Sequence, residues 1–216
     1  MGTRYKAAPG ARLRVASASG SIVIASEDRD DFEVEPPDRR VEVSDGGRVV
    51  EVRSRSSSMR IRCPKGSDVS VGAMSGSVRL EGTFGSVKIN AVSGSIEVEE
   101  ALGDVDVRSV SGNLSVGKCG GACSINSKSG RIAIGHVTGA TKAATISGSL
   151  ELETEGQQDL EVKTISGRMT LLIPKGRHPR VRFRTLAGKL HCDCPQGNDF
   201  EIRAASVSGS IDIKQS

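Results

Sequence analysis

Apolar residues recur in a fixed frame along most of this 216-residue chain. Glycines mark the frame: they lie eighteen residues apart from Gly76 to Gly148, and nineteen to twenty-one residues apart from there to Gly209. The second and fourth positions after each glycine are apolar, and the positions between them are mostly polar. These two columns, with an outlying copy after Gly20, contain Ile22, Ile24, Val78, Leu80, Ile96, Val98, Leu114, Val116, Ile132, Ile134, Leu150, Leu152, Met169, Leu171, Leu190, Cys192, Ile211 and Ile213. This period-two alternation predicts β-strands with one buried face.

A second strand is predicted in each repeat, ahead of the corner glycine. It follows another glycine half a period away, in segments such as "SVKI" and "DVDV", whose inward pairs would be Val87/Ile89 and Val105/Val107. The position two residues before the corner glycine is also apolar, and we assign it to the buried face of the strands. This column contains Met74, Val92, Val110, Ile146, Ile165, Leu186 and Val207, with Lys128 as its exception.

A fixed repeat of this length over most of a chain is typical of stacked-repeat proteins. We therefore predict an all-β fold, a single-stranded β-solenoid (β-helix) with coils of 18–21 residues. Each coil would stack about 4.8 Å from the next. The glycines would allow a tight corner, which needs a positive φ or room for the backbone of the neighbouring coil. An antiparallel meander or sandwich is the alternative, although neither needs a constant register.

The two ends of the chain differ in this pattern. Residues 1–70 lack the regular repeat and are predicted to form irregular β coils that cap the N-terminal end, continuous with a regular solenoid over residues 71–216. No comparable segment follows the last repeat, "SGSIDIKQS". We therefore expect an uncapped C-terminal coil in which Ser208, Gly209, Ile211 and Ile213 offer backbone groups to a partner strand. Two such edges could pair and give a homo-oligomer.

The composition narrows the class of protein. Aromatic residues make up only 2% of the chain, so the core must be thin and built from Val, Ile and Leu. A net charge of +4 indicates a mixed, mildly basic surface. No apolar run reaches the roughly 18–20 residues of a membrane span, and the N-terminal residues lack the apolar stretch of a secretory signal. We expect a cytoplasmic protein; a membrane-anchored or extracellular parent protein is the alternative.

The serial motifs resemble a known family. The segment "IRCPKGSDVSVGAMSGSVRL" is followed by tiles of the "VSGSIEV" type and by a second proline–lysine–glycine turn in "LLIPKG". This pattern, over residues 11–214, resembles the bacterial putative-adhesin family, a β-strand-repeat domain of unknown function. The resemblance implies a right-handed or related β-solenoid and a bacterial source. It implies no catalytic residues.

The cysteines and histidines give little support for catalysis or metal binding. Five cysteines, an odd number, lie mostly in inward columns and are predicted to be reduced core residues. A redox pair of Cys119 and Cys123 is an alternative. A shared metal site with His191, Cys192 and Cys194 is disfavoured because the two groups would lie about four coils apart, roughly 19 Å. The sequence contains no recognisable catalytic motif, so we predict no enzyme activity and no cofactor.

One polar segment is a candidate binding site. In "RHPRVRFR", Val181 and Phe183 would face inward, so that Arg180, Arg182 and Arg184 line up on the outer face. Three guanidinium groups in a row could bind phosphate, an acidic glycan or an acidic protein surface. A solvated edge that discourages aggregation is the alternative reading. Nucleic acid is an unlikely ligand, since exposed aromatic residues are scarce. The sequence thus favours a structural or interaction module that self-associates or binds a protein, with an anion-binding module as the alternative.

Overall fold

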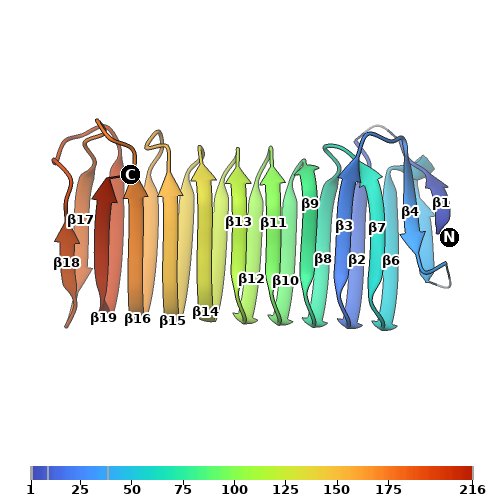
Figure 1. The fold of residues 1–216 in the computed structure, drawn as a ribbon, viewed down its shortest axis with the longest axis horizontal. Helices are drawn as coiled ribbons and strands as arrows, with labels where there is room; N and C mark the ends of the chain where they lie inside the picture. The colour runs from blue at the N-terminus through green and yellow to red at the C-terminus, as the bar shows by residue number, and fades with distance from the viewer. Residues whose placement is uncertain (1, 9, 38, 216) are drawn as a thin grey trace.

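In a computed structural model, which describes residues 2–8, 10–37 and 39–215, the chain is all-β and its strands are hydrogen-bonded into one mixed sheet of 19 strands. The sheet is folded into a rod with two facing rows of strands (Figure 1). Within the described residues, no helix is long and apolar enough to span a membrane.

Nine strands precede or begin the regular repeats. They are β1 Thr3–Lys6, β2 Arg12–Ser19, β3 Ile22–Glu27, β4 Asp31–Glu35, β5 Arg40–Ser44, β6 Val49–Ser56, β7 Met59–Pro64, β8 Asp68–Ser75 and β9 Val78–Phe84, with the short 3-10 helix η1 Asp45–Gly47 between β5 and β6. The remaining strands are β10 Val87–Ser93, β11 Ile96–Ala101, β12 Val105–Ser111, β13 Leu114–Cys119, β14 Cys123–Val137, β15 Thr141–Thr154, β16 Leu160–Ile173, β17 Arg180–Thr185, β18 Lys189–Cys192 and β19 Glu201–Gln215. From β14 onward the two strands of a repeat are mostly one continuous element that bends at the corner.

From β8 to β15 the repeats pair in parallel at an offset of eighteen residues, and β16 follows β15 at nineteen. In one row, Val87 of β10 is in register with Val69 of β8 and with Val105 of β12. In the other row, Ile96 of β11 is in register with Val78 and with Leu114. The predicted all-β class and eighteen-residue register are therefore confirmed, and an antiparallel meander is excluded for these repeats because each strand pairs with the next repeat.

The core is a narrow aliphatic column between the two rows. The predicted inward positions two and four residues after the corner glycines are buried in almost every repeat, and the pairs Val87/Ile89 and Val105/Val107 are also buried. Leu190, at 37% exposed, and the half-buried Cys192 are the exceptions. Both exceptions belong to β18, which lies at one end of the rod.

The apolar column two residues before each corner glycine faces solvent, so its assignment to the buried face is wrong. Ala91 is in register with Ala73, and Ser93 with Ser75, while Val92 between them lies 48% exposed. Val92 keeps the outward parity of Lys88 and Asn90 in β10, and the parity changes only across the corner at Gly94, so the inward positions after the glycine cannot be extended back to it. We call these residues the apolar ladder: Met74, Val92, Val110, Ile146, Ile165, Val207 and Leu186.

The corner glycines stack directly on one another. Gly94 has a φ of +119°, and a Cβ on it would lie 1.9 Å from the carbonyl oxygen of Gly76 in the preceding repeat. Serines support the corner: the Ser93 hydroxyl donates to the carbonyl of Met74 at 3.4 Å, and Ser111 donates to Val92 at 3.5 Å. The corner therefore requires glycine for both its conformation and its space.

Strand pairs do not follow chain order at either end of the rod. β2 lies between β6 and β8, and β3 lies between β7 and β9, so the first strand pair of the chain is enclosed by later ones. The antiparallel strands β1, β4 and β5 then cover this end. The division into N-terminal capping coils over residues 1–70 and a regular part over residues 71–216 stays a prediction, and the insertion of β2 and β3 was not predicted.

The C-terminal strand is also enclosed, and the prediction that it forms an open edge is wrong. β19 pairs with β16 on one side and with β17 and β18 on the other, so the C-terminus lies beside β16 and not at the tip of the rod (Figure 1). The four residues expected at that edge are all within this pairing. Their partners are Ser166 for Ser208, Gly167 for Gly209, Met169 and Leu190 for Ile211, and Leu171 and Cys192 for Ile213. After β16 the chain does not pair the next repeat, β17 and β18, with β16. Those two strands lie one position farther out, and β19 occupies the position between them and β16.

Candidate functional site

β17 carries the predicted row of arginines on its outer face. Arg180, Arg182 and Arg184 are exposed, while Val181 and Phe183 between them are half-buried and pack against the core. Their orientation thus follows the predicted alternation; a binding role for them stays a prediction.

The arginines of β17 adjoin other cations to form a basic groove of about 360 Å³. We define the basic groove by Lys163, Arg182, Arg184 and Arg203, which surround the small Ala205. Two carboxylates, Glu161 and Glu201, lie beside them. Since four cations face two carboxylates, the groove keeps an excess of positive charge.

The acidic side chains beside the groove are held by specific contacts. Arg182 Nε lies 2.6 Å from Glu201 Oε1, and Arg203 also contacts Glu201. The hydrogen bond from Lys163 holds the pKa of Glu161 below its usual range. Arg184 forms no ion pair with any described residue. Arg184 is therefore the cation best placed to meet an outside anion.

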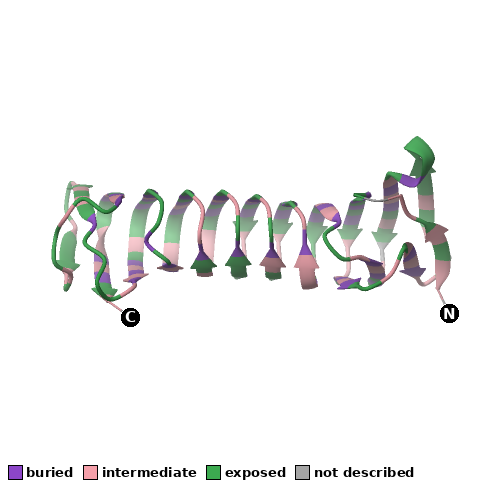
Figure 2. Ribbon diagram, turned by 90° about the horizontal axis from the view of Figure 1, so that it is seen from above, coloured by how far each residue is buried: buried purple, intermediate pink, exposed green. Residues whose placement is uncertain are grey.

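The outer edge of β17 is unpaired. β17 and β18 pair only with β19, and no described strand lies on their other side. The Arg180 N–H donates to the Phe200 carbonyl at 2.8 Å. Because backbone groups alternate direction in a parallel pair, the N–H groups of Val181, Phe183 and Thr185 point away from β19. We call the end of the rod formed by β17 and β18 the open end. In Figure 2 the residues at this end are largely exposed or intermediate.

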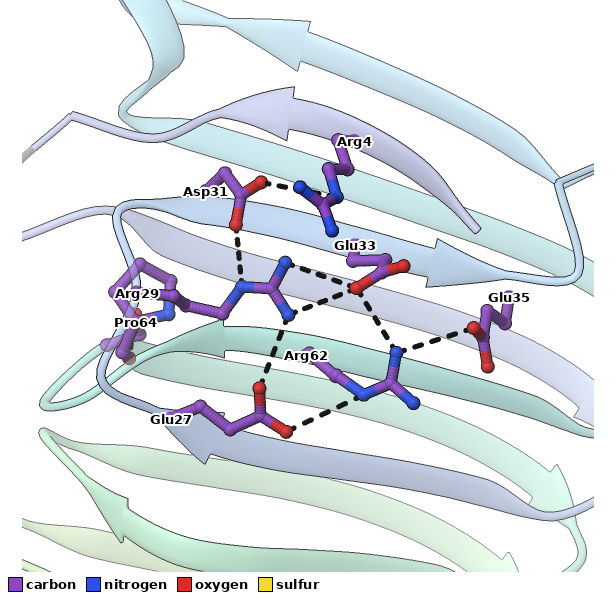
Figure 3. Close-up of polar contacts among 9 residues, drawn as sticks. Arg4, Glu27, Arg29, Asp31, Glu33, Glu35, Arg62 and Pro64 are labelled. Atoms are coloured by element: carbon purple, nitrogen blue, oxygen red, sulfur yellow. Dashed lines mark hydrogen bonds and ion pairs between the residues drawn. The ribbon is translucent and has the colours of Figure 1, made fainter. Parts of the chain in front are cut away.

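A cluster of charged side chains lies at the opposite end of the rod (Figure 3). Arg29 Nε lies 2.6 Å from Asp31 Oδ1 and its Nη2 lies 3.2 Å from Glu33 Oε2. Arg62 Nη1 lies 3.1 Å from the same Glu33 oxygen and 3.4 Å from Glu35. The cluster joins β4 to β7 and to the turn after β3. The acidic and basic run "EDRDDFEVE" was a signal for it in the sequence, but the partner Arg62 is too distant in the chain to be inferred.

The pKa values of this cluster indicate a structural role. The hydrogen bond from Arg29 lowers the pKa of Asp31. Burial opposes ionisation of Glu33, but hydrogen bonds from Arg62 and Arg29 outweigh it and hold the pKa of Glu33 below its usual range. The pKa of Arg62 is raised by its hydrogen bond to Glu33. Both carboxylates are therefore fixed as paired anions, which suits neither a general acid nor a general base at neutral pH.

All five cysteines are free thiols, as the sequence predicted. Cys63, Cys119 and Cys123 are buried, while Cys192 and Cys194 near the open end are half-buried. Burial raises the pKa of Cys63 to about 12. The hydrogen bond donated by the Cys123 thiol lowers the pKa of Cys119 and raises that of Cys123. The structure thus brings Cys119 and Cys123 together, but inside the core, where an outside reagent has no access.

Metal-ligating side chains do not gather in the part of the chain that the structure describes: no group of three His, Cys, Asp or Glu residues could hold an ion. Asp104, in the segment "GDVDV", instead accepts a hydrogen bond from the Ala122 N–H at 2.8 Å. Asp68 makes the same contact with the Ser86 N–H. These aspartates tie one repeat to the next at the corner opposite the glycines.

Comparison with known proteins agrees with the fold. The family described as Toastrack DUF4097 matches residues 10–120. A putative adhesin from Bacteroides fragilis has a similar structure, with 14% identity, a TM-score of 0.60, and coverage of 99% of this chain and 96% of that chain. A putative adhesin from Parabacteroides distasonis has 12% identity and a TM-score of 0.50, with coverage of 99% and 96%. Among curated proteins, none matches this chain. At these identities the likeness concerns the fold alone.

Proposed function

Because this chain belongs to the Toastrack DUF4097 family and is similar in structure to a putative adhesin from Bacteroides fragilis, we propose that it is a non-enzymatic β-solenoid that acts as an interaction module. The parallel pairing of repeats eighteen residues apart supports the solenoid description. The part of the molecule that meets a protein partner is the open end.

The observation that carries this proposal is the contrast between the two ends of the rod. At the N-terminal end, antiparallel strands cover the last parallel pair. At the open end, Leu190 is 37% exposed and Leu186 is 85% exposed. An edge strand with outward N–H groups beside exposed aliphatic side chains is a template for an added strand.

The charges at the open end indicate the chemistry of the partner strand. Arg180, Arg182 and Arg184 of β17 would lie beside the outward side chains of an added strand, and acidic side chains there would pair with them. Two copies of this chain meeting end to end would instead bring arginines against arginines, or against Lys189 of β18. A strand with alternating acidic and apolar residues is therefore preferred over self-pairing.

A pair of synthetic peptides tests this function. One peptide alternates glutamate with valine, and the other alternates lysine with valine; binding of each to the full chain is measured by fluorescence anisotropy at low and high salt. We expect the acidic peptide to bind, with an affinity that falls as salt rises, and the basic peptide not to bind.

Two variants separate backbone pairing from charge attraction. Val181→Pro removes an outward N–H without removing a hydrogen bond to β19, and should abolish binding of the acidic peptide. Replacing all three arginines by glutamate should reverse the preference between the peptides. Equal binding of both peptides, or full binding by Val181→Pro, would rule out strand addition at this edge.

A second candidate function, binding of a small anionic group, is favoured by the basic groove. Its volume and its excess of positive charge suit a phosphate or sulfate group held by Arg184 and Arg203. Titration with inorganic phosphate and with a sulfated oligosaccharide, compared between the native chain and Arg184→Gln, tests it. Binding that is lost in Arg184→Gln but unaffected by Val181→Pro would support the groove over the edge.

A further inference from the structure

The apolar ladder is an exposed feature on one corner of the rod, and Lys128 interrupts it once, between Val110 and Ile146. Its members lie between two columns of residues that are in register: Ser109, Ser127 and Thr145 on one side, and Ser111, Ser129 and Ser147 on the other. Val110 is 40% exposed, Ile146 44% and Ile165 49%. From Val110 to Leu186 the ladder runs over six neighbouring repeats, roughly 24 Å at normal strand spacing. The corners that carry it form the lower edge of the molecule in Figure 1.

Cations flank this part of the ladder on both sides. One side is the row of strands that precede the corner glycines. There the outward residues two positions before the ladder are in register with one another: Arg108, Asn126, Ala144, Lys163, Ala205 and Arg184. On the other side, the first residues after the glycines in register are Arg131, Ser149, Arg168, Ser210 and Lys189. Lys128 lies within the ladder itself. The two flanking columns and Lys128 together provide seven exposed cations, and they contain no aspartate or glutamate.

Most of these cations have no anionic partner among the residues that the structure describes. Arg108 Nε lies 3.6 Å from Asp106, and Lys163 contacts Glu161. The other five form no ion pair with any described residue: Lys128, Arg131, Arg168, Arg184 and Lys189. Beside Ile146 and Ile165 lies a hollow of about 420 Å³, whose rim includes Arg108, Lys128 and Lys163.

We propose that this corner, with its apolar ladder and flanking cations, docks on an anionic lipid bilayer. The branched side chains at the tip of the corner would enter the boundary between head groups and acyl chains, and the cations on both sides would meet lipid phosphates. A convex corner suits a soft, flat surface, whereas a protein partner would need a matching groove. A second copy of this chain is disfavoured because its seven cations would meet the same seven.

Vesicle binding tests the proposal on the full chain. Co-sedimentation is measured with vesicles of phosphatidylcholine alone and with vesicles that also contain phosphatidylglycerol. We expect binding only to the anionic vesicles, with an affinity that decreases as salt increases. The charge variant Arg131→Gln/Arg168→Gln, which leaves the basic groove untouched, should bind roughly 25-fold more weakly, at about fivefold for each cation. The apolar variant Ile146→Ser/Ile165→Ser should weaken binding by about tenfold or more at unchanged charge.

Matched controls lie at the opposite corner. The control variant Leu102→Ser/Lys175→Gln replaces one exposed leucine, Leu102 at 61% exposed, and one lysine. It should bind the vesicles as the native chain does. An environment-sensitive dye on Ile146→Cys should shift to the blue with anionic vesicles, whereas the same dye on Leu102→Cys should not. Binding that depends on the cations but not on Ile146 and Ile165 would mean simple adsorption by charge and would overturn the proposal. No binding to anionic vesicles, or equal loss in the control variant, would also overturn it.

Discussion

Gly94 lies so close above Gly76 that a Cβ on the first would be 1.9 Å from the carbonyl oxygen of the second. The same relationship holds between Gly112 and Gly94, again at 1.9 Å, and between Gly148 and Gly130 at 2.0 Å. The neighbouring atom in each case is backbone, which cannot move aside as a flexible side chain would. Each corner therefore requires glycine because the backbone of the preceding corner occupies the space that a side chain would need.

Gly94→Ala should destabilise the fold by about 3 kcal/mol or more, because it adds a steric overlap to the cost of a positive φ. The comparison is Gly66→Ala: Gly66 also has a positive φ, +73°, but nothing lies within 4 Å of its Cβ position. That control should cost only about 1–2 kcal/mol. Chemical denaturation of both variants gives the two free energies of unfolding, and similar values for both would contradict the stacking argument.

Acid should weaken the N-terminal end through Asp31 and Glu33. Their pKa values are lowered in the folded chain, so the stability they contribute is present above the pKa of an unfolded carboxyl, about 4. It is lost as the pH falls from there through the lowered folded values. Glu33→Gln should reduce stability at neutral pH and make its decrease in acid shallower. Thermal melts between neutral pH and pH 3 measure this.

Glu97→Gln is the control for the acid experiment. Glu97 lies 2.8 Å from Arg79, but both side chains are more than half exposed, so water and salt screen the pair. Its melts should follow those of the native chain across the pH range. An unchanged acid profile in Glu33→Gln would mean that the cluster does not govern acid unfolding.

The enclosed position of β19 predicts that its core residues matter as much as those in mid-rod. Ile213 is fully buried between Leu171 and Cys192, so Ile213→Ala should cost about 3 kcal/mol, as should Ile132→Ala in the middle of the stack. Leu190→Ala, at the open end, should cost about 1 kcal/mol or less. A small loss for Ile213→Ala would indicate that β19 is an edge after all.

Thiol reactivity should divide the cysteines into two groups. Cys63, Cys119 and Cys123 are buried, and they should react with a thiol reagent only after unfolding. Cys192 and Cys194 are half-buried and should react in the native chain, but slowly for Cys194, because burial and the neighbouring Cys192 raise its pKa to about 12. Mass spectrometry of native and unfolded samples counts the labels. Fast native labelling of Cys119 would revive a redox role for it.

The alternation of apolar and polar residues correctly predicted the strands and buried columns of the repeats. The columns after the glycines, such as Ile96 and Val98, are buried because strand periodicity depends only on nearby residues. Val92 obeys the same rule within β10, where it is outward with Lys88 and Asn90; its assignment to the buried face failed because the parity of Ile96 was extended back across the corner at Gly94, where the parity changes. The site was predicted in part: the row from Arg180 to Arg184 follows from alternation within one strand.

The remainder depends on contacts that no local pattern specifies. Ser208 to Ile213 have the same motif as every interior repeat, so the motif fits equally well beside β16 as at the end of the stack. The cluster around Glu33 requires Arg62, which is brought near by the antiparallel pairing of β4 with β7. Asp104 accepts a hydrogen bond from Ala122 of the next repeat, a contact that depends on the stacking of repeats and not on the local sequence.

Enclosure of both terminal strand pairs also determines how this architecture can change in length. A new repeat placed beside β2 and β3, or beside β19, would break existing pairings, whereas the interior between Gly76 and Gly148 consists of interchangeable units. Inserting one eighteen-residue unit there would lengthen the rod by about 4.8 Å and leave both ends as they are. The number of interior units therefore sets the distance between the charged cluster at one end of the rod and the arginine-lined edge at the other.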